Sequence, residues 1–94
     1  MKHAGPAALD RLEPFLEELR AITLLKERAR GTFYRGSRAF LHFHEHGEDL
    51  YADIRFADVW ERLPATTAAQ RLKLKRRLKR ACEKDIGKAK LPPV

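Results

Sequence analysis

The sequence predicts a single α+β domain over residues 1–94, in which a three-stranded antiparallel sheet packs against an N-terminal and a C-terminal helix. Apolar residues recur every three or four positions near both ends of the chain, which is the spacing of amphipathic helices. Between these ends, apolar and polar side chains alternate, as they do in strands with one buried face. A chain of 94 residues is long enough for one modest core and too short for a second domain.

The N-terminal part of the chain, residues 6–30, is predicted to be helical. Pro14 lies inside this segment, and a proline removes a backbone donor and clashes with the preceding turn. We therefore expect a kink or a restart there, with Pro14 near the first turn of the main helical segment. Residues 23–30 are expected to end the helix and to form a charged connector. The helical spacing is carried by Leu9, Leu12, Phe15, Leu16, Leu19 and Ile22.

Residues 31–56 are predicted to form the sheet as a β-meander. Three strands are expected at 32–34, 38–44 and 50–56, with turns at Gly36 and Gly47 between them. In the last strand every second residue is apolar, which indicates one buried and one wet face. In the middle strand, Phe40, His42 and His44 fall on the face opposite the core.

Two more helices are predicted after the meander. Residues 57–63 suit a short helix over the sheet, because Val59, Trp60 and Leu63 have helical spacing and a proline follows. Residues 67–70, Thr-Ala-Ala-Gln, match a capping box, in which the Thr and Gln side chains bond to the first amides of a helix. That helix is expected to span 67–86 and to end at Gly87, leaving residues 87–94 as an extended tail.

The predicted C-terminal helix has an apolar face and a basic face. The apolar face holds Leu74, Leu78 and Ala81, together with Cys82, which is expected to be a small buried hydrophobe. Residues 71–90 contain ten basic and two acidic side chains, a net charge of +8, so the rest of the chain carries −1 of the total of +7. The basic face consists of Lys73, Arg76, Arg77, Arg80 and Lys84.

This basic face predicts a non-enzymatic binding module that contacts nucleic acid or another polyanion. Basic side chains on one helix face neutralise phosphates, and their affinity depends on salt and not on base sequence. An acidic protein offers the same charge, and a solvated face that keeps the chain soluble is the plainer alternative. The apolar arc lacks aromatic anchors, so no membrane partner is expected. The sequence has no apolar run of ~18 residues and no signal peptide, so we expect a cytoplasmic protein.

The first predicted hairpin also carries a family resemblance. Residues 32–41, Thr-Phe-Tyr-Arg-Gly-Ser-Arg-Ala-Phe-Leu, combine an aromatic strand, a turn of glycine and basic residues, and an aromatic-apolar second strand. With the strand at 50–56 and Trp60 after it, this pattern resembles the small bacterial YjbR/MmcQ-like proteins over about residues 15–63. The resemblance implies a compact α+β sandwich that contacts DNA through its hairpins, with Arg35 and Arg38 at the matching hairpin.

Three histidines at alternate positions, His42, His44 and His46, are candidate metal ligands. Imidazoles that share one strand face, together with a carboxylate, can bind Zn²⁺ or another transition ion. His46 falls in the predicted turn, however, and the pattern offers no fourth ligand. We therefore favour partly exposed imidazoles on a wet sheet face, and expect no cofactor and a fold that needs no metal.

Catalysis has little support in the sequence. His42 or His44 would lie within reach of Asp53 across the predicted ladder, an arrangement that suits an acid/base pair. The sequence has no glycine-rich phosphate loop, nucleophile elbow or paired carboxylates, and a domain this small encloses little concave volume. We therefore expect that the protein is not an enzyme.

The second functional hypothesis is a protein–protein interaction or homodimeric scaffold with no role in nucleic-acid binding. Aromatic residues are dense around the predicted sheet, where they are expected to fill the core, although aromatics interleaved with arginine also form base-stacking platforms. Phe40 on the outer face would leave an apolar patch, and a second copy of the chain is the partner expected to cover it.

Overall fold

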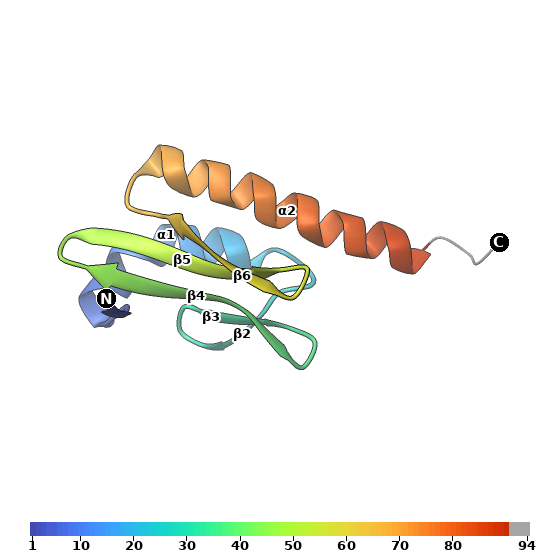
Figure 1. Ribbon diagram of the computed structural model, residues 1–94, viewed down its shortest axis with the longest axis horizontal. Coiled ribbons are helices and arrows are strands. Elements are labelled where there is room, and N and C mark those ends of the chain that lie inside the picture. Colours follow the sequence, from blue (N-terminus) through green and yellow to red (C-terminus); the bar gives the residue numbers. More distant parts are fainter. Residues whose placement is uncertain (91–94) are drawn as a thin grey trace.

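The computed structural model describes the backbone of residues 1–90 and the side chains of residues 1–82. Its two helices and its antiparallel sheet confirm the predicted α+β class (Figure 1). In chain order the elements are β1 (Lys2–His3), α1 (Pro6–Arg20), β2 (Lys26–Ala29), β3 (Thr32–Arg35), β4 (Arg38–His46), β5 (Asp49–Phe56), β6 (Val59–Pro64) and α2 (Ala68–Lys90).

The sheet has six strands, so the prediction of three strands is wrong in number. Its centre, β3 to β5, matches the predicted meander, and β2 and β6 extend this meander to the order β2-β3-β4-β5-β6. β3 pairs with the first part of β4, as far as Leu41, and β1 pairs with a later part of the same strand, where His3 lies opposite His44. β2 and β6 are therefore the two edges of the meander.

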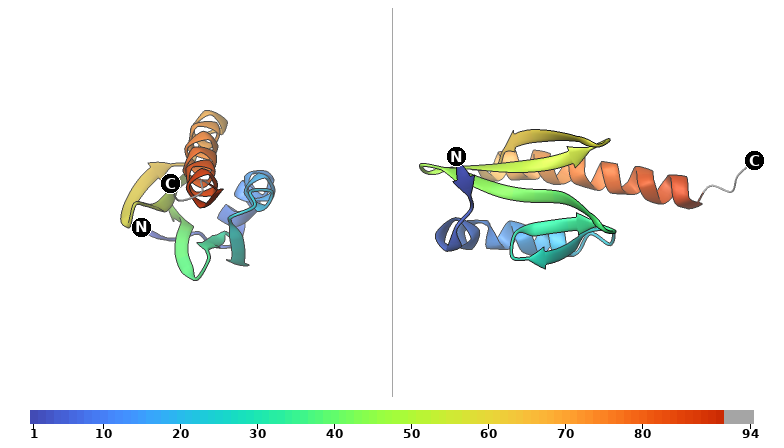
Figure 2. Two further views of the ribbon diagram at one scale, coloured as in Figure 1. Left: turned by 90° about the vertical axis from the view of Figure 1, so that its right-hand side faces the viewer. Right: turned by 60° about the horizontal axis from the view of Figure 1, so that its bottom comes forward.

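Both helices lie on the concave side of the sheet, as the end-on view in Figure 2 shows. They bury their apolar faces against the core face of the strands, where Leu41 pairs with Ile54 and Phe43 with Ala52. Cys82 is buried there, as predicted. The helix residues in this core are Ala8, Leu12, Phe15, Leu16, Leu19, Leu74, Leu78 and Cys82.

The predicted helical segment 6–30 is only partly correct. α1 begins at Pro6, whose missing N–H matters little in a first turn, and runs through Pro14 to Arg20. Pro14 therefore lies in the middle of the helix and not near its first turn. The expected connector contains β2, which pairs with β3. Pairing with the open edge of β3 satisfies backbone groups, and this outweighs the weak strand pattern of Lys-Glu-Arg-Ala.

The segment predicted as a short helix, 57–63, is also wrong, because it contains most of strand β6. Ala57 and Asp58 have positive φ angles of 48° and 67°, which reverse the chain within two residues. β6 then pairs along β5 from Val59 to Pro64. A helix here would leave the backbone groups along that edge of β5 without partners, and this outweighs the helical spacing of the apolar residues.

Phe40 lies in the core and not on the outer face, so that prediction is wrong. The register between β3 and β4 shifts next to Leu41, which makes Phe40 an extra residue in β4. Such a bulge changes the alternation of side chains locally. Phe40 is 3% exposed, and its ring meets Phe56 edge to face at 6.2 Å. The apolar outer patch from which a homodimer was predicted is therefore not formed by Phe40.

α2 opens with the predicted capping box. The backbone N–H of Gln70 donates to Thr67 Oγ1 at 3.1 Å, and the N–H of Thr67 donates to Gln70 Oε1 at 3.0 Å. The helix does not end before Gly87 as predicted but continues to Lys90, because the alanine and lysines around it favour a helix. Of the predicted extended tail 87–94, residues 87–90 are therefore helical, and 91–94 lie outside the described residues.

Candidate functional site

The basic face of α2 is exposed wherever its side chains are described. Lys73, Arg76, Arg77 and Arg80 are all exposed, and the C-terminal part of the helix runs beyond the β5–β6 hairpin (Figure 1). Within residues 1–82, no ion pair involves Lys73, Arg76 or Arg80. The side chain of Lys84 lies outside the described residues. The exposed basic face predicted from the sequence is therefore present over its first two turns.

Arg77 lies at the border between the basic and apolar faces of α2. Its Nη1 donates to Glu61 Oε2 at 2.6 Å and its Nη2 to Oε1 at 3.2 Å, while the guanidinium lies 4.6 Å from the centre of the Phe56 ring. The bond from Arg77 lowers the pKa of Glu61, so this carboxylate is charged at neutral pH. On the other flank of α2, Lys75 pairs with Glu18 of α1 at 2.9 Å. Ion pairs thus hold α2 on both flanks.

A row of cations and rings connects α2 to the β3–β4 hairpin. It begins at Arg77 over Phe56, continues through the edge-to-face contact of Phe56 with Phe40, and ends at Arg35, 4.8 Å from the centre of the Phe40 ring. A cation over a ring face is attracted by the ring quadrupole. The row therefore connects Arg77, from the predicted basic face of α2, with Arg35, from the predicted hairpin.

A cavity of about 320 Å³ opens between the β3–β4 and β5–β6 hairpins. Three arginines line it, Arg35, Arg38 and Arg55, against one carboxylate, Asp58, which pairs with Arg38 at 2.7 Å. Arg55 lies 4.8 Å from the centre of the Trp60 ring, and its buried Nε has no hydrogen-bond partner within the described part of the chain. Surplus positive charge and an unused guanidinium donor suit the binding of an anion.

We call these arginines, together with the basic face of α2, the basic surface. Sequence reasoning missed Arg55, because it faces Trp60 across a strand pair that is absent if residues 57–63 form a helix. The alternation of Tyr51, Asp53 and Arg55 on the last predicted strand was the available signal. The basic surface consists of Arg35, Arg38, Arg55, Lys73, Arg76, Arg77 and Arg80.

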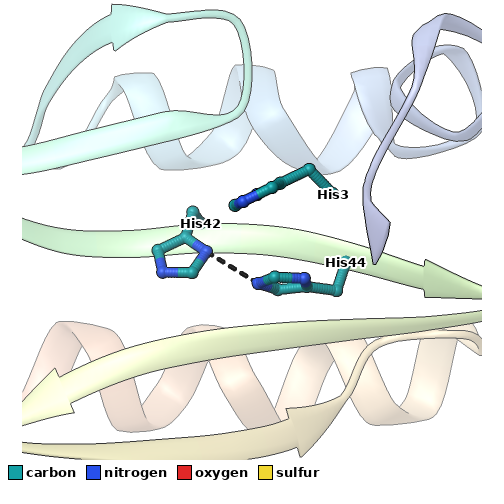
Figure 3. A group of neighbouring side chains, drawn as sticks. All are labelled: His3, His42 and His44. Carbon is teal, nitrogen blue, oxygen red and sulfur yellow. Dashed lines mark hydrogen bonds between the residues drawn. The ribbon is translucent and has the colours of Figure 1, made fainter. Parts of the chain in front are cut away.

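A second cluster of functional side chains lies on the opposite face of β4 from the core. His42 and His44 project from β4 and His3 from β1, and one ring nitrogen of each lies within 4.8 Å of the others (Figure 3). His46, the third histidine considered from the sequence, is the exposed last residue of β4 and is not part of this group. Sequence reasoning missed His3, because a two-residue strand carries no periodic signal.

Asp53 on β5 contacts the histidine cluster. His44 Nε2 lies 3.1 Å from Asp53 Oδ2 and 3.0 Å from His42 Nδ1. Arg62 donates two hydrogen bonds to Asp53, at 2.7 and 2.8 Å, and thereby lowers the pKa of this carboxyl. Burial lowers the pKa of both His42 and His44, which favours their neutral form. The sequence suggested that Asp53 would lie within reach of His42 or His44, and in the structure it contacts His44.

Comparison with protein-family models, with curated proteins and with solved structures finds no match to this chain. The resemblance to the YjbR/MmcQ-like proteins therefore stays a prediction. Within the described residues, neither helix combines the length and the apolar character that a membrane span needs. The chemistry of the basic surface and of the histidine cluster is thus the basis for a functional proposal.

Proposed function

We propose that the protein is a non-enzymatic binding module that contacts nucleic acid through its basic surface, in the cytoplasm. The observation that carries this proposal is the row from Arg77 through Phe56 and Phe40 to Arg35. Its three steps of 4.6, 6.2 and 4.8 Å keep Arg77 of α2 and Arg35 of the cavity close enough together for one extended anion to reach both. A basic helix face that stayed separate from the hairpins would support a solubility role equally well.

The arginines of the basic surface match the chemistry of a phosphodiester chain. A guanidinium offers a planar fork of donors that binds two phosphate oxygens at once, and Arg76 and Arg80 are exposed for such contacts. The ring of Trp60 is 42% exposed beside Arg55. An exposed ring next to basic side chains favours nucleic acid over an acidic protein, because bases stack on aromatic faces.

The experiment that tests the proposal is a titration of labelled, random-sequence DNA and RNA with the protein at several salt concentrations. Each phosphate neutralised on B-DNA contributes about −0.9 to the slope of log K against log salt, so we expect a slope of about −3 to −5. Absence of binding at micromolar protein in ~50 mM salt would contradict the proposal, because nonspecific binding is strongest at low salt.

A pair of double variants locates the contact. Arg76→Ala with Arg80→Ala should make the slope less negative by roughly 1.8, because two phosphate contacts are removed. The matched control, Lys2→Ala with Arg11→Ala, removes the same charge near the β4–β5 turn, where Arg11 donates to the carbonyl of Glu48. Equal losses in both double variants would show attraction by net charge alone and would contradict a defined surface.

The same preparations separate the scaffold hypothesis from the proposal. Sedimentation of the free chain reports its oligomeric state before any nucleic acid is added. A dimer that binds no DNA or RNA would favour the homodimeric scaffold, whereas a chain that binds with the expected salt dependence supports the binding module.

A further inference from the structure

None of the three clustered histidines belongs to the basic surface, and the geometry of the cluster is that of a partly assembled metal site. Two of its members, His42 and His44, share one face of β4, and His3 reaches the same place from β1, which is 39 residues away in sequence from His42 (Figure 3). The rings of His3 and His44 stack with 4.6 Å between their centres, and those of His42 and His44 are 4.9 Å apart.

The distances between the imidazole nitrogens are close to those that one ion imposes. With Zn–N bonds of about 2.0–2.1 Å, two ligands of a tetrahedral Zn²⁺ lie about 3.3 Å apart. His42 Nδ1 and His44 Nε2 are already 3.0 Å apart, and the three ligand nitrogens lie within 4.8 Å of one another. His3 is exposed, so its side chain has room to move toward the other two when an ion binds.

The backbone already holds β1 in the position that the site requires. His3 is the register partner of His44, and the N–H of Ala4 donates to the carbonyl of Phe43 at 3.1 Å. The N–H of Gly5 donates to Glu45 Oε2 at 2.6 Å. The position of His3 is thus fixed from the residues that follow it, so an ion would bind a site whose ligands are brought together by folding.

Asp53 supplies the negative charge that a divalent ion needs nearby. Its Oδ2 lies 3.1 Å from His44 Nε2, and its two bonds from Arg62 fix the orientation of the carboxylate. Because Oδ2 contacts the same nitrogen that would bind the ion, the carboxylate lies close enough to stabilise the positive charge of a bound ion. The ring of Trp60 lies 5.0 Å from that of His42 and covers one side of the cluster. Imidazole nitrogens are the ligands that suit Zn²⁺, Cu²⁺ and Ni²⁺, whereas Mg²⁺ and Ca²⁺ prefer oxygen.

We propose that His3, His42 and His44 form a binding site for a single divalent transition-metal ion of the Zn²⁺ class, with Asp53 as its charged neighbour. Three protein ligands leave one tetrahedral position for water or an added ligand. The ion connects β1 to β4, so its binding should also protect the amide of Ala4 from hydrogen exchange.

The test is calorimetric titration of the full chain with Zn²⁺, together with the fluorescence of the single tryptophan, Trp60, which adjoins His42. We expect one Zn²⁺ per chain and a fluorescence change that saturates at the same ratio. The variant His3→Gln should weaken binding by about 10-fold or more, since loss of even an outer partner has an effect of 10–100-fold. A stoichiometry far from one, or no heat and no fluorescence change, would overturn the proposal.

The control is His46→Gln, which removes a histidine from the same face of the same strand but outside the cluster. This variant should bind Zn²⁺ with the affinity of the parent. If His3→Gln and His46→Gln weakened Zn²⁺ binding equally, the proposed site would be wrong. His44 is nearly buried, so His3, which is exposed, is the better position to change without unfolding. Thermal melts of both variants without metal should match the parent, and Zn²⁺ should raise the melting temperature of the parent and of His46→Gln only.

Discussion

Glu61 on β6 and Arg77 on α2 form a two-point ion pair at the edge of the sheet. The pair connects the last strand to the last helix, and Phe56 lies under the same guanidinium. Glu61 therefore neutralises one of the arginines of the basic surface.

Removing this acid should strengthen the binding of nucleic acid. In Glu61→Gln, Arg77 is released for a phosphate, and we expect a salt slope more negative by about 0.9. Stability should change little, because exposed ion pairs contribute only about 0–1 kcal/mol. Salt titrations check this, with Glu17→Gln as a control that removes an exposed acid of α1. Equal affinities of the two variants would show that only net charge matters.

Phe40 is the ring through which the hairpin meets the core, so its removal should cost stability. We expect Phe40→Ala to lower the free energy of unfolding by about 3–5 kcal/mol, which combines lost burial with a cavity. Urea denaturation measures this difference. Val59→Ala, at a position that is 68% exposed, should stay within about 0.5 kcal/mol of the parent. If Phe40→Ala changed the free energy of unfolding only slightly, the Phe40 ring would not be buried in the core as the bulge in β4 places it.

The capping box of α2 gives a third prediction. Thr67→Ala removes the acceptor for the Gln70 amide, and we expect a loss of about 1 kcal/mol in the free energy of unfolding. Gln70→Ala removes the reciprocal bond, so the two changes should not be additive. A double-mutant cycle in urea measures the coupling, and strict additivity would argue against a shared cap.

The cluster of Glu13, Arg20 and Arg30 predicts a pH dependence. Hydrogen bonds from Arg20 and Arg30 lower the pKa of Glu13 from 4.5 to about 2. A pKa that is lower in the folded state stabilises the fold fully above pH 4.5 and progressively less as the pH falls through 2. We expect Glu13→Gln to melt below the parent at pH 7 and close to it at pH 2. A gap that persists at pH 2 would show that packing, and not charge, explains the loss.

The sequence was sufficient for the parts of the fold that carry local signals. Alternation at 50–56, glycine turns at Gly36 and Gly47, and the Thr67–Gln70 cap all define their elements without reference to distant residues. The exposure of the basic face of α2 follows from helical spacing alone. These are the features for which local and tertiary preferences agree.

The rest of the fold depends on pairing that a single sequence does not display. β2 has little apolar alternation, and the turn before β6 uses Ala57 and Asp58 where a hairpin of this kind more often has glycine or asparagine. The bulge that buries Phe40 is set by register with β3. The same pairing explains why two site residues were missed. Arg55 lies beside Trp60 only because β6 pairs with β5, and His3 lies beside His44 only because β1 pairs with β4.

The residues of β2 and β6, the two edges of the meander, bear on whether copies of this protein can pair strand to strand. An open edge is a template for strand addition and fibril growth unless its residues oppose it. β2 presents Lys26, Glu27 and Arg28, and β6 carries Glu61 and ends at a proline, which cannot donate to an incoming strand. Each edge thus resists the pairing of strands between molecules that would extend the sheet.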